Sequence, residues 1–452
     1  MGRDGLFEDL PDAGKPERPS SGRAEARVLR PERRQIAMRA VNLDGFLPAD
    51  HRARLVWAWV EAQDIAALYA AIKARGSVAG RAAIDPAILL ALWLYALIEG
   101  VGSARQIERL VEQDLAYMWL AGEVGVNHHA LSDFRIGHED LVDRLLTRSI
   151  VALEAVGPVT LGLVTLETLA VDGVRVRAHA GQASFRRRET LDELERKASE
   201  RVAELKGRLG DAPTVDKRRA AAIVRAARER AERIAKAQRE LAEREAERKQ
   251  RQRSNKKKTA RQGPVRTSTS DAEARVMKMP EGGFRPAYNV QVITDPVSGL
   301  IVATAIDSTG SDRSLLGKAL EKIRQQYAKV LKIVLADGGF FAITDVEWTH
   351  NHDPAITAYL PLTVNKHGTD PYTARKDDGP GVAALRQRMQ SEEGKAVYRQ
   401  RSPAELPHAR LRAYGLNQFT LRSAAKALIW AALASNLIIS FGRNQRKTCT
   451  AT

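Results

Sequence analysis

Two apolar, strand-like runs, each closed by an Asp-Gly pair, constrain the fold of this chain more than any other feature. The first run reaches Asp172-Gly173 through Val171, and the second reaches Asp337-Gly338 through Leu335. Asp-Gly is also a hairpin-turn dipeptide, so the first pair alone is compatible with a turn between two strands. From about residue 160 onward the chain is therefore expected to form strands.

Further signals between these pairs predict how the strands are connected. Residues 289–294 and 300–306 surround a turn at 295–299 and are typical of a hairpin, and residues 315–323 have helical spacing before the run that ends at Asp337. Strands, a helix and another strand predict a mixed α/β sheet. With 452 residues and 44% hydrophobic content, the chain can bury a substantial core in two or three domains.

A charged helical segment interrupts the predicted sheet. The formal net charge of the chain is +17, and residues 186–262 alone hold 26 Lys and Arg against 14 Asp and Glu, an excess of +12. Apolar residues recur every three or four positions on both sides of a break at 207–213, which predicts a helical hairpin. Its charge favours a phosphate backbone. Two interpretations of this hairpin compete: it docks on DNA or on another subunit, or it is a solvated coiled coil. Residues 256–270 are expected to follow as a flexible loop.

The N-terminal part is expected to be helical after a mobile tail. Residues 1–36 lack apolar periodicity, whereas residues 47–148 have helical spacing. Asp85-Pro86 is a helix start signal, and Asn127 is a good N-cap for a later helix.

The helix after Asn127 carries polar residues on one face, namely His128, Ser132 and Arg135. This face is compatible with a helix-turn-helix that contacts DNA, and the alternative is an ordinary bundle whose polar face meets water. No Cys and no additional His is spaced to make His128 and His129 metal ligands, so a solvated or capping role is favoured for them.

The C-terminal apolar stretch at residues 424–441 is expected to be a buried core helix followed by a polar tail at 442–452. It just reaches the ~17 residues that span a bilayer, and it contains Lys426, Ser435 and Asn436. No charged-then-apolar signal pattern opens the chain, and the single Cys449 cannot form an internal disulfide. These observations favour a cytoplasmic protein that does not enter a membrane.

The motif Y-x2-R-x3-E-x6-R is formed by Tyr398, Arg401, Glu405 and Arg412. On a continuous helix these four residues would share one face. Pro403 and Pro407 strain that helix, and Ser402 with Glu405 also matches a capping box, a purely structural reading of the glutamate.

The carboxylates of Asp172, Asp337 and Glu405, with basic residues nearby, suggest metal-dependent chemistry on nucleic acid. Gathered carboxylates repel each other unless cations lie between them, and Mg2+ prefers carboxylate oxygens with water and phosphate. Glu392 and Glu393 are the competing third ligands. Tyr288-Asn289 opens a predicted strand and is expected to line the site.

Taken in order along the chain, these motifs resemble those of bacterial insertion-sequence transposases of the DDE type. The resemblance rests on Val171-Asp172-Gly173, the segment Gly283–Gln291, Ala336-Asp337-Gly338-Gly339 and the Y-x2-R-x3-E-x6-R motif. One difference is that many relatives have a proline directly after the glutamate, where this chain has Leu406. The resemblance implies a helical DNA-binding domain at 37–150 and a ribonuclease-H-like domain at 160–441, interrupted by the basic helical insertion and loop at 186–270.

The resemblance also implies the chemistry. Asp172, Asp337 and Glu405 would be the catalytic residues and would hold two divalent metals, Mg2+ or alternatively Mn2+, ~4 Å apart. Tyr398, Arg401 and Arg412 would contact the DNA near the cleaved end. The enzyme would cut at the terminal inverted repeats of its own element and join the 3′ ends to target DNA, working at the nucleoid as a homodimer or larger assembly.

Two other functions compete with an active transposase. One is a catalytically inactive or repurposed relative that binds DNA without cutting it. The other, a coiled-coil scaffold or RNA-binding protein, would explain residues 186–262 but leave the remaining motifs unexplained.

Overall fold

The computed structural model describes residues 42–74, 82–155, 166–210, 217–254, 263–327, 331–352, 354–362, 370–413, 416–419 and 424–450. The chain divides into two units, Met1–Asn42 and Leu43–Thr452. Every element described below belongs to the second unit. The tail predicted at 1–36 lies outside the described residues.

The central sheet is mixed and has the strand order β6-β5-β1-β7-β8, with β4 paired to the beginning of β5. Strands β6, β5 and β1 are antiparallel neighbours, while β1, β7 and β8 are parallel. In chain order this is a 3-2-1-4-5 sheet, the arrangement of a ribonuclease-H-like fold, and the predicted α/β class is confirmed. The strands are β1 (Thr168–Arg177), β4 (Arg275–Lys278), β5 (Phe284–Thr294), β6 (Ile301–Asp307), β7 (Ile333–Ala336) and β8 (Thr357–Tyr359).

Strand β1 runs through Asp172-Gly173 without a turn. The pairing with β5 continues from Val171↔Ile293 through Asp172↔Val292 and Gly173↔Gln291. The hairpin-turn reading of this dipeptide is therefore wrong, because the long partner strand β5 holds both residues extended. The hairpin predicted at 289–306 is confirmed as β5 and β6.

Helices cover both faces of the sheet. On one face, α11 (Leu316–Gln326) connects β6 to β7 and α12 (Ile343–Asn351) connects β7 to β8, and both pack into a core with Val171, Ile293 and Val334. The C-terminal segments are α13 (Pro380–Gln390), α14 (Glu392–Arg399), the 3-10 turn η5 (Ser402–Glu405), α15 (Leu406–Ala413) and α16 (Ala424–Thr450).

The N-terminal part is helical, as predicted. Asp85 caps α3 by accepting a hydrogen bond from the amide of Ala87, and Asn127 caps α6 by accepting one from the amide of Ala130. The helices are α1 (Arg52–Glu61), α2 (Ala66–Ala70), α3 (Pro86–Ile98), α4 (Ala104–Gln113), α5 (Leu115–Ala121), α6 (His128–Gly137) and α7 (Glu139–Ala155), after the 3-10 turn η1 (Leu43–Phe46).

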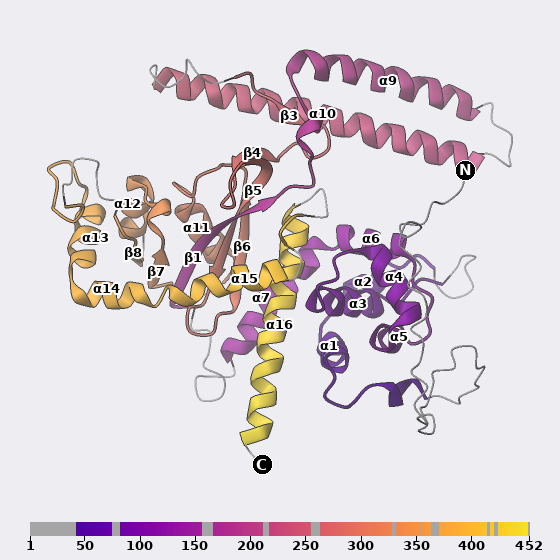
Figure 1. Cartoon of the computed structure of the whole chain (residues 1–452), viewed down its shortest axis with the longest axis horizontal. Helices are drawn as coiled ribbons and strands as arrows, with labels where there is room; N and C mark the ends of the chain where they lie inside the picture. The colour runs from indigo at the N-terminus through magenta and orange to yellow at the C-terminus, as the bar shows by residue number, and fades with distance from the viewer. Residues whose placement is uncertain are drawn as a thin grey trace, which may run out of the picture. The chain divides into compact units, whose positions relative to one another are not determined.

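Helix α16 joins these helices to the sheet (Figure 1), and it contacts α3, α7 and β6. Its buried Trp430 lies against the rings of Trp93 and Phe134, with ring centroids 6.5 Å and 6.1 Å away. The same apolar cluster includes Tyr288 of β5 and Val176 of β1. The predicted segments 37–150 and 160–441 therefore share a hydrophobic core.

The apolar stretch at 424–441 is a buried core helix, as predicted, and the segment expected as a polar tail at 442–452 continues the same helix. Helix α16 continues to Thr450, and residues 451 and 452 lie outside the described chain. Within the described residues, no helix has both the length and the apolar character needed to cross a membrane.

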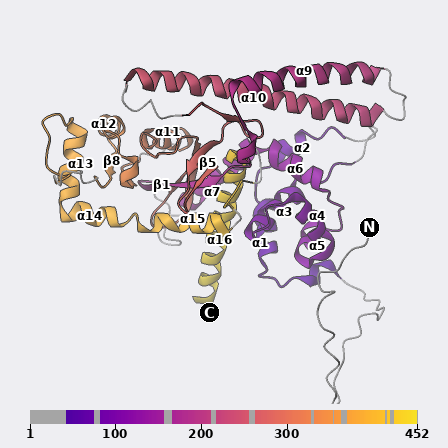
Figure 2. The ribbon, with the colours of Figure 1, turned by 45° about the horizontal axis from the view of Figure 1, so that its top comes forward.

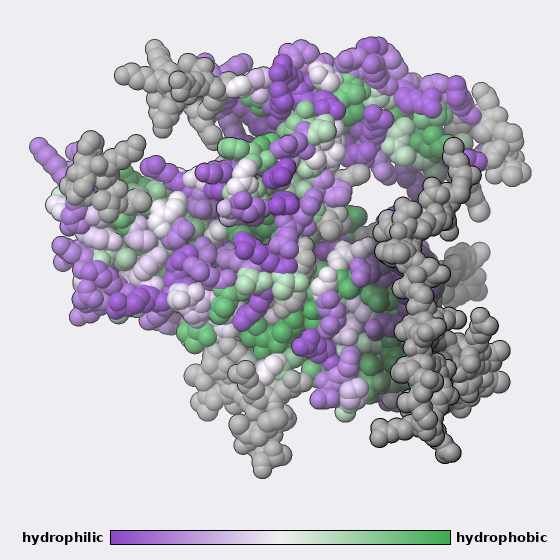
Figure 3. Space-filling model, in the orientation of Figure 1, coloured by the Kyte–Doolittle hydropathy of each residue, from purple (hydrophilic) through white to green (hydrophobic). Residues whose placement is uncertain are grey.

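The charged insertion forms the predicted helical hairpin, α9 (Arg188–Gly210) and α10 (Lys217–Ser254), which lie side by side in both ribbon views (Figures 1 and 2). Its surface is mainly hydrophilic (Figure 3). The loop predicted at 256–270 contains a short strand, β3 (Thr267–Ser268), paired with β2 (Phe185–Arg186), which follows the 3-10 turn η2 (Gln182–Ser184). The described end of this segment is therefore structured at the base of the hairpin.

Arg244 fastens the hairpin to this base. Its guanidinium is buried and donates hydrogen bonds to the carbonyl oxygens of Arg266, Ala272, Glu273 and Ala274. Several carbonyl acceptors for one buried cation offset part of its desolvation. The hairpin is thus held at the C-terminal half of α10.

Candidate active site

The parallel pairing of β1 and β7 brings the first two predicted carboxylates together. The last registered pair is Val171↔Ala336, so Asp172 and Asp337 are the next residues on two adjacent strands. Strand β7 ends at Ala336, and the edge of the sheet opens there. Two residues that are distant in sequence therefore meet at one sheet edge.

Asp172 is buried and contacted by the side chains of Arg401 and His408. Nη2 of Arg401 donates a hydrogen bond of 2.8 Å to its Oδ1, and Nε2 of His408 lies 3.1 Å from its Oδ2. The His408 contact is at ion-pair distance but is not aligned as a hydrogen bond. Burial alone would raise the pKa of Asp172, but His408, the charge of Arg401 and the amide of Gly173 together lower it below its ordinary value.

Asp337 has the opposite electrostatic balance. Its Oδ1 accepts a hydrogen bond of 2.7 Å from the amide of Gly339. Burial raises its pKa most, Gly339 and Arg401 oppose this, and the negative charges of Asp172 and Asp312 raise it further, so the pKa stands above its ordinary value. Such mutual repulsion is expected where carboxylates share a site without a metal ion.

Glu405 lies apart from the two aspartates. Its side chain is 75% exposed, and its Oε1 is 4.0 Å from Nη1 of Arg401. Arg401 therefore lies between Asp172 and Glu405 and links them. Glu392 and Glu393, the competing third ligands, are exposed in the first turn of α14, where Glu392 pairs with Lys395.

The Y-x2-R-x3-E-x6-R motif does not form one continuous helix. Helix α14 ends at Arg399, η5 carries Glu405, and α15 begins at Leu406. Arg401 is the N-cap residue of η5 and Ser402 already belongs to the turn, so the predicted Ser402 capping box does not form. Pro403 occupies the first turn, where its missing N–H leaves no hydrogen bond unmade.

The other two motif residues lie on either side of this centre. Tyr398 is half-buried against the α11 side of the core. Burial raises its pKa, Arg401 lowers it, and the negative charge of Asp337 raises it further, so the pKa stands above its ordinary value. Arg412 is exposed on α15 and lines the cleft described next.

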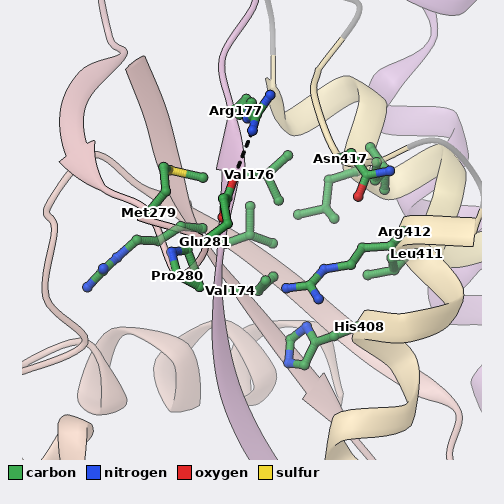
Figure 4. Close-up of a pocket in the computed structure, with 14 residues that line it drawn as sticks. Val174, Val176, Arg177, Met279, Pro280, Glu281, His408, Leu411, Arg412 and Asn417 are labelled. Carbon is green, nitrogen blue, oxygen red and sulfur yellow. Dashed lines mark hydrogen bonds and ion pairs between the residues drawn. The ribbon is translucent and has the colours of Figure 1, made fainter. Parts of the chain in front are cut away.

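A cleft runs beside the carboxylates. One part is lined by Gly173, Asn289, Asp312, Glu405 and Arg412. The adjoining part shares Arg412, Arg175 and His408 with it and adds Arg177, which pairs with Glu281 at 2.9 Å (Figure 4). Three arginines thus line a groove that begins at the acidic centre, an arrangement that suits a phosphate backbone.

Two site residues, His408 and Asp312, were not predicted from the sequence. His408 falls on the buried face of α15, a helix of about two turns, and no spacing rule links it to Asp172. Asp312 follows β6, and the end of that strand is the sequence signal that could have pointed to it. Asn289 was expected to line the site and does so, donating a 2.8 Å hydrogen bond to Asp312.

The predicted DNA-contacting face of α6 requires a correction. Arg135 is 3% exposed, lies over the ring of Trp93 and donates to the carbonyl of Gly102. Burial lowers its pKa to about 10. Its guanidinium is part of the core and does not face DNA, since the helix turns this side toward α3.

His128 and Ser132 remain nearer the surface of α6. His128 Nδ1 is 2.7 Å from a carboxylate oxygen of Glu108, whose other oxygen accepts the His128 amide. Ser132 is partly exposed. A DNA contact by these two residues stays a prediction.

The donor set suits a hard divalent cation in kind, because the groups at the centre are carboxylates and an amide. In the described part of the chain, no three acidic, His or Cys side chains are already arranged to hold a metal ion. Arg401 and His408 instead contact the carboxylate oxygens of Asp172. The residues therefore fit a cation once Asp172 is released from these contacts.

The 3-2-1-4-5 sheet defines a ribonuclease-H-like domain. It carries one carboxylate on its central strand and a second just beyond the end of the adjacent parallel strand, beside an arginine-lined groove. Two family models match the chain: a transposase domain (DUF772) at residues 41–136 and a transposase DDE domain at residues 264–439. The chain belongs to the insertion-sequence DDE transposases. Strand β1, with Asp172, lies between the matched ranges, and the sheet pairing unites it with Asp337. No curated protein and no solved structure matches the chain.

Proposed function

We propose that this transposase cleaves DNA at the terminal inverted repeats of its element and transfers the released 3′ ends to target DNA, with Asp172, Asp337 and Glu405 as the metal-holding catalytic residues. The observation that carries the proposal is the shared sheet edge of Asp172 and Asp337, with Arg401 between Asp172 and Glu405. Two Mg2+ ions, or Mn2+ in their place, would activate the attacking oxygen and stabilise the leaving one.

The reaction is a pair of phosphodiester exchanges. In the first, a water oxygen bonds to phosphorus at the element end while the bond from phosphorus to the 3′ oxygen breaks, which leaves a 3′-hydroxyl. In the second, that hydroxyl oxygen bonds to a target phosphorus, and the target strand is cut there. No covalent bond to the protein is needed, so the chain's part is to position the strands and to balance their charge.

The basic residues of the cleft would hold the strands. Arg412 and Arg175 line the groove beside Glu405, and paired guanidinium donors match phosphate oxygens. Arg401 would move from Asp172 toward a phosphate when cations take its place, and Tyr398 would contact the cleaved end. Because two element ends must be joined, we expect two or more copies to assemble on the DNA.

Cleavage of labelled terminal DNA with and without Mg2+ tests this proposal. Wild type should nick the DNA only with Mg2+ or Mn2+, and Asp172→Asn, Asp337→Asn and Glu405→Gln should each lower the rate by at least ~100-fold while DNA binding persists. The matched control is Glu392→Gln, an exposed glutamate that already pairs with Lys395, which should cleave normally.

The outcomes separate the competing functions. Tight binding to the terminal repeats with no cleavage by wild type would favour an inactive DNA-binding relative. If Glu392→Gln abolished cleavage and Glu405→Gln did not, the third catalytic carboxylate would have to be reassigned.

A further inference from the structure

The connection between β6 and α11 places a fourth carboxylate beside the buried Asp172 and the partly exposed Asp337. If Gly173 carried a Cβ, that atom would overlap Oδ1 of Asp312. A Cβ at Gly339 would stand 2.9 Å from Oδ1 of Asp337 and 3.6 Å from Oδ2 of Asp312. The two glycines therefore leave room for Asp312 next to Asp172 and Asp337, at the open edge of the sheet.

Asp312 is held in this position by strand β5. Asn289 and Gln291 both donate to its Oδ1, at 2.8 Å and 3.0 Å. On β5, Gln291 is paired with Gly173 of β1, and Asn289 is paired with Arg175. Within the described chain, Oδ2 accepts no hydrogen bond, so one oxygen is anchored and the other remains available.

A second tether fixes the loop itself. Arg175 of β1 donates to the carbonyl of Gly310 at 2.9 Å and to the carbonyl of Lys278. The loop is thus bound to the same strand that carries Asp172. Asp312 and Asn289 also line the cleft that contains Glu405, and His408, which is 8% exposed and contacts Asp172, lines the same cleft.

We propose that Asp312 is a further carboxylate ligand of the catalytic cation, shared with Asp337, and that Asn289 and Gln291 are its positioning residues. The inference rests on the proposed metal-dependent function. Glu405 is largely exposed and separated from Asp172 by Arg401, whereas Asp312 lies beside Gly173 and Gly339, the neighbours of the two aspartates. Because two amides already anchor one oxygen of Asp312, the carboxylate loses little conformational freedom when its other oxygen binds a cation.

Cation binding without DNA tests this directly. Asp312→Asn keeps the side-chain shape and removes the charge, and it should weaken Mn2+ binding, measured by titration calorimetry, by at least ~10-fold. Gln291→Met, which removes one anchoring amide, should give a smaller loss. Asp307→Asn is the matched control, because it removes the same charge from the same connection, where that carboxylate binds Lys318 and the amide of Thr309.

A spectroscopic readout distinguishes ligation from a structural role. In a Cys449→Ser background, Asp312→Cys should show a sulfur-to-cobalt charge-transfer band when Co2+ is added, and Asp307→Cys should show none. Absence of the band together with wild-type Mn2+ affinity in Asp312→Asn would overturn the inference while leaving the proposed function intact. Failure of wild type itself to bind Mn2+ and to cleave DNA would instead count against the proposed function.

Discussion

At the scale of single residues, Arg401 and His408 hold the buried carboxylate at the centre of the candidate site. Both contact Asp172, whose side chain is 11% exposed. An ionised carboxylate at this depth is unfavourable without compensation, and these side chains supply it in the absence of metal. If Asp172 holds the proposed divalent cation, the same contacts would weaken when that cation binds.

Replacing Arg401 therefore should make stability depend on the cation. Arg401→Met leaves Asp172 with His408 alone, and losing one partner of a buried ion pair costs roughly 3–5 kcal/mol. Added Mg2+ should restore much of this loss, because the ion neutralises the same carboxylate. Denaturant unfolding with and without Mg2+ measures the effect.

Arg388→Met provides the comparison for this experiment. The partly buried guanidinium of Arg388 lies over the ring of Tyr359 and donates to the carbonyl of Ala358. The stability that this variant loses should therefore be the same with and without Mg2+. An equal response of both variants to the ion would contradict the role assigned to Arg401.

Asp271 should make stability depend on pH. Burial, against the opposing hydrogen bond from Tyr288, raises its pKa from 3.8 to about 6. The folded state thus keeps a proton that the unfolded state has lost, so this contribution is complete below pH ~4 and disappears as pH rises to ~6. At ~1.4 kcal/mol per pKa unit, ionising Asp271 in the folded protein lowers the free energy of unfolding by roughly 3 kcal/mol.

Asp271→Asn stays neutral at every pH. The difference in free energy of unfolding between the variant and wild type should therefore shift in favour of the variant between pH 4 and pH 7. Parallel stability curves for the two proteins would show that Asp271 ionises normally in the fold.

The residues that could be predicted from the sequence are those that directly follow an apolar, strand-like run. Asp172 and Asp337 follow apolar runs, and period-2 patterning combined with parallel pairing brings them together. His408 and Asp312 were missed because each reaches the site through a loop or short helix whose path no periodicity specifies. Arg135 was misplaced because a charged residue on a helix can lie on an aromatic ring inside the core.

At the scale of elements, the hairpin divides its charge unequally between two helices. The sequence of α9 holds six basic and six acidic residues, while that of α10 holds 14 basic and six acidic. In α9, Arg196, Lys197 and Arg201 each pair with a glutamate of the same helix. The basic excess of the hairpin helices therefore belongs to α10, and its N-terminal half lies beyond the anchor at Arg244.

Neutralising this half of α10 should weaken DNA binding in a salt-dependent way. Arg225, Arg228 and Arg230 are exposed, and each phosphate contact contributes about one unit to the slope of log affinity against log salt. The triple change to Gln should reduce the slope by up to ~3. Filter binding or fluorescence anisotropy over a salt series measures it.

The triple change Arg196→Gln, Lys197→Gln and Arg201→Gln is the control, since it removes the same number of positive charges from the same hairpin. These charges are already engaged by glutamates, so the slope should stay near wild type. Equal slopes in both triple variants would indicate that α10 is a solvated helix or a subunit contact.

At the scale of the whole molecule, the shared core was beyond sequence prediction. The apolar patterns of α3 and α16 indicate burial but not which surfaces meet, and α3, with all 13 residues buried, has no polar face to orient it. The structure places α16 between the N-terminal helices and β6. The proposed DNA contacts of those helices and the proposed chemistry at the sheet would thus depend on one hydrophobic core.

Asn436 shows how α16 is fixed to the sheet, and it gives the last prediction. Its Oδ1 accepts from the amide of Ile301 at 2.8 Å, and its Nδ2 donates to the carbonyl of Ile301 at 2.7 Å, both buried. Asn436→Leu leaves two buried backbone groups unpaired at roughly 1–3 kcal/mol each. The neighbouring Ser435→Ala should cost nothing or stabilise, because the buried Ser435 hydroxyl has no partner in the described structure. Thermal unfolding of the two variants measures the contrast, and equal melting temperatures would mean that apolar packing alone holds α16 against β6.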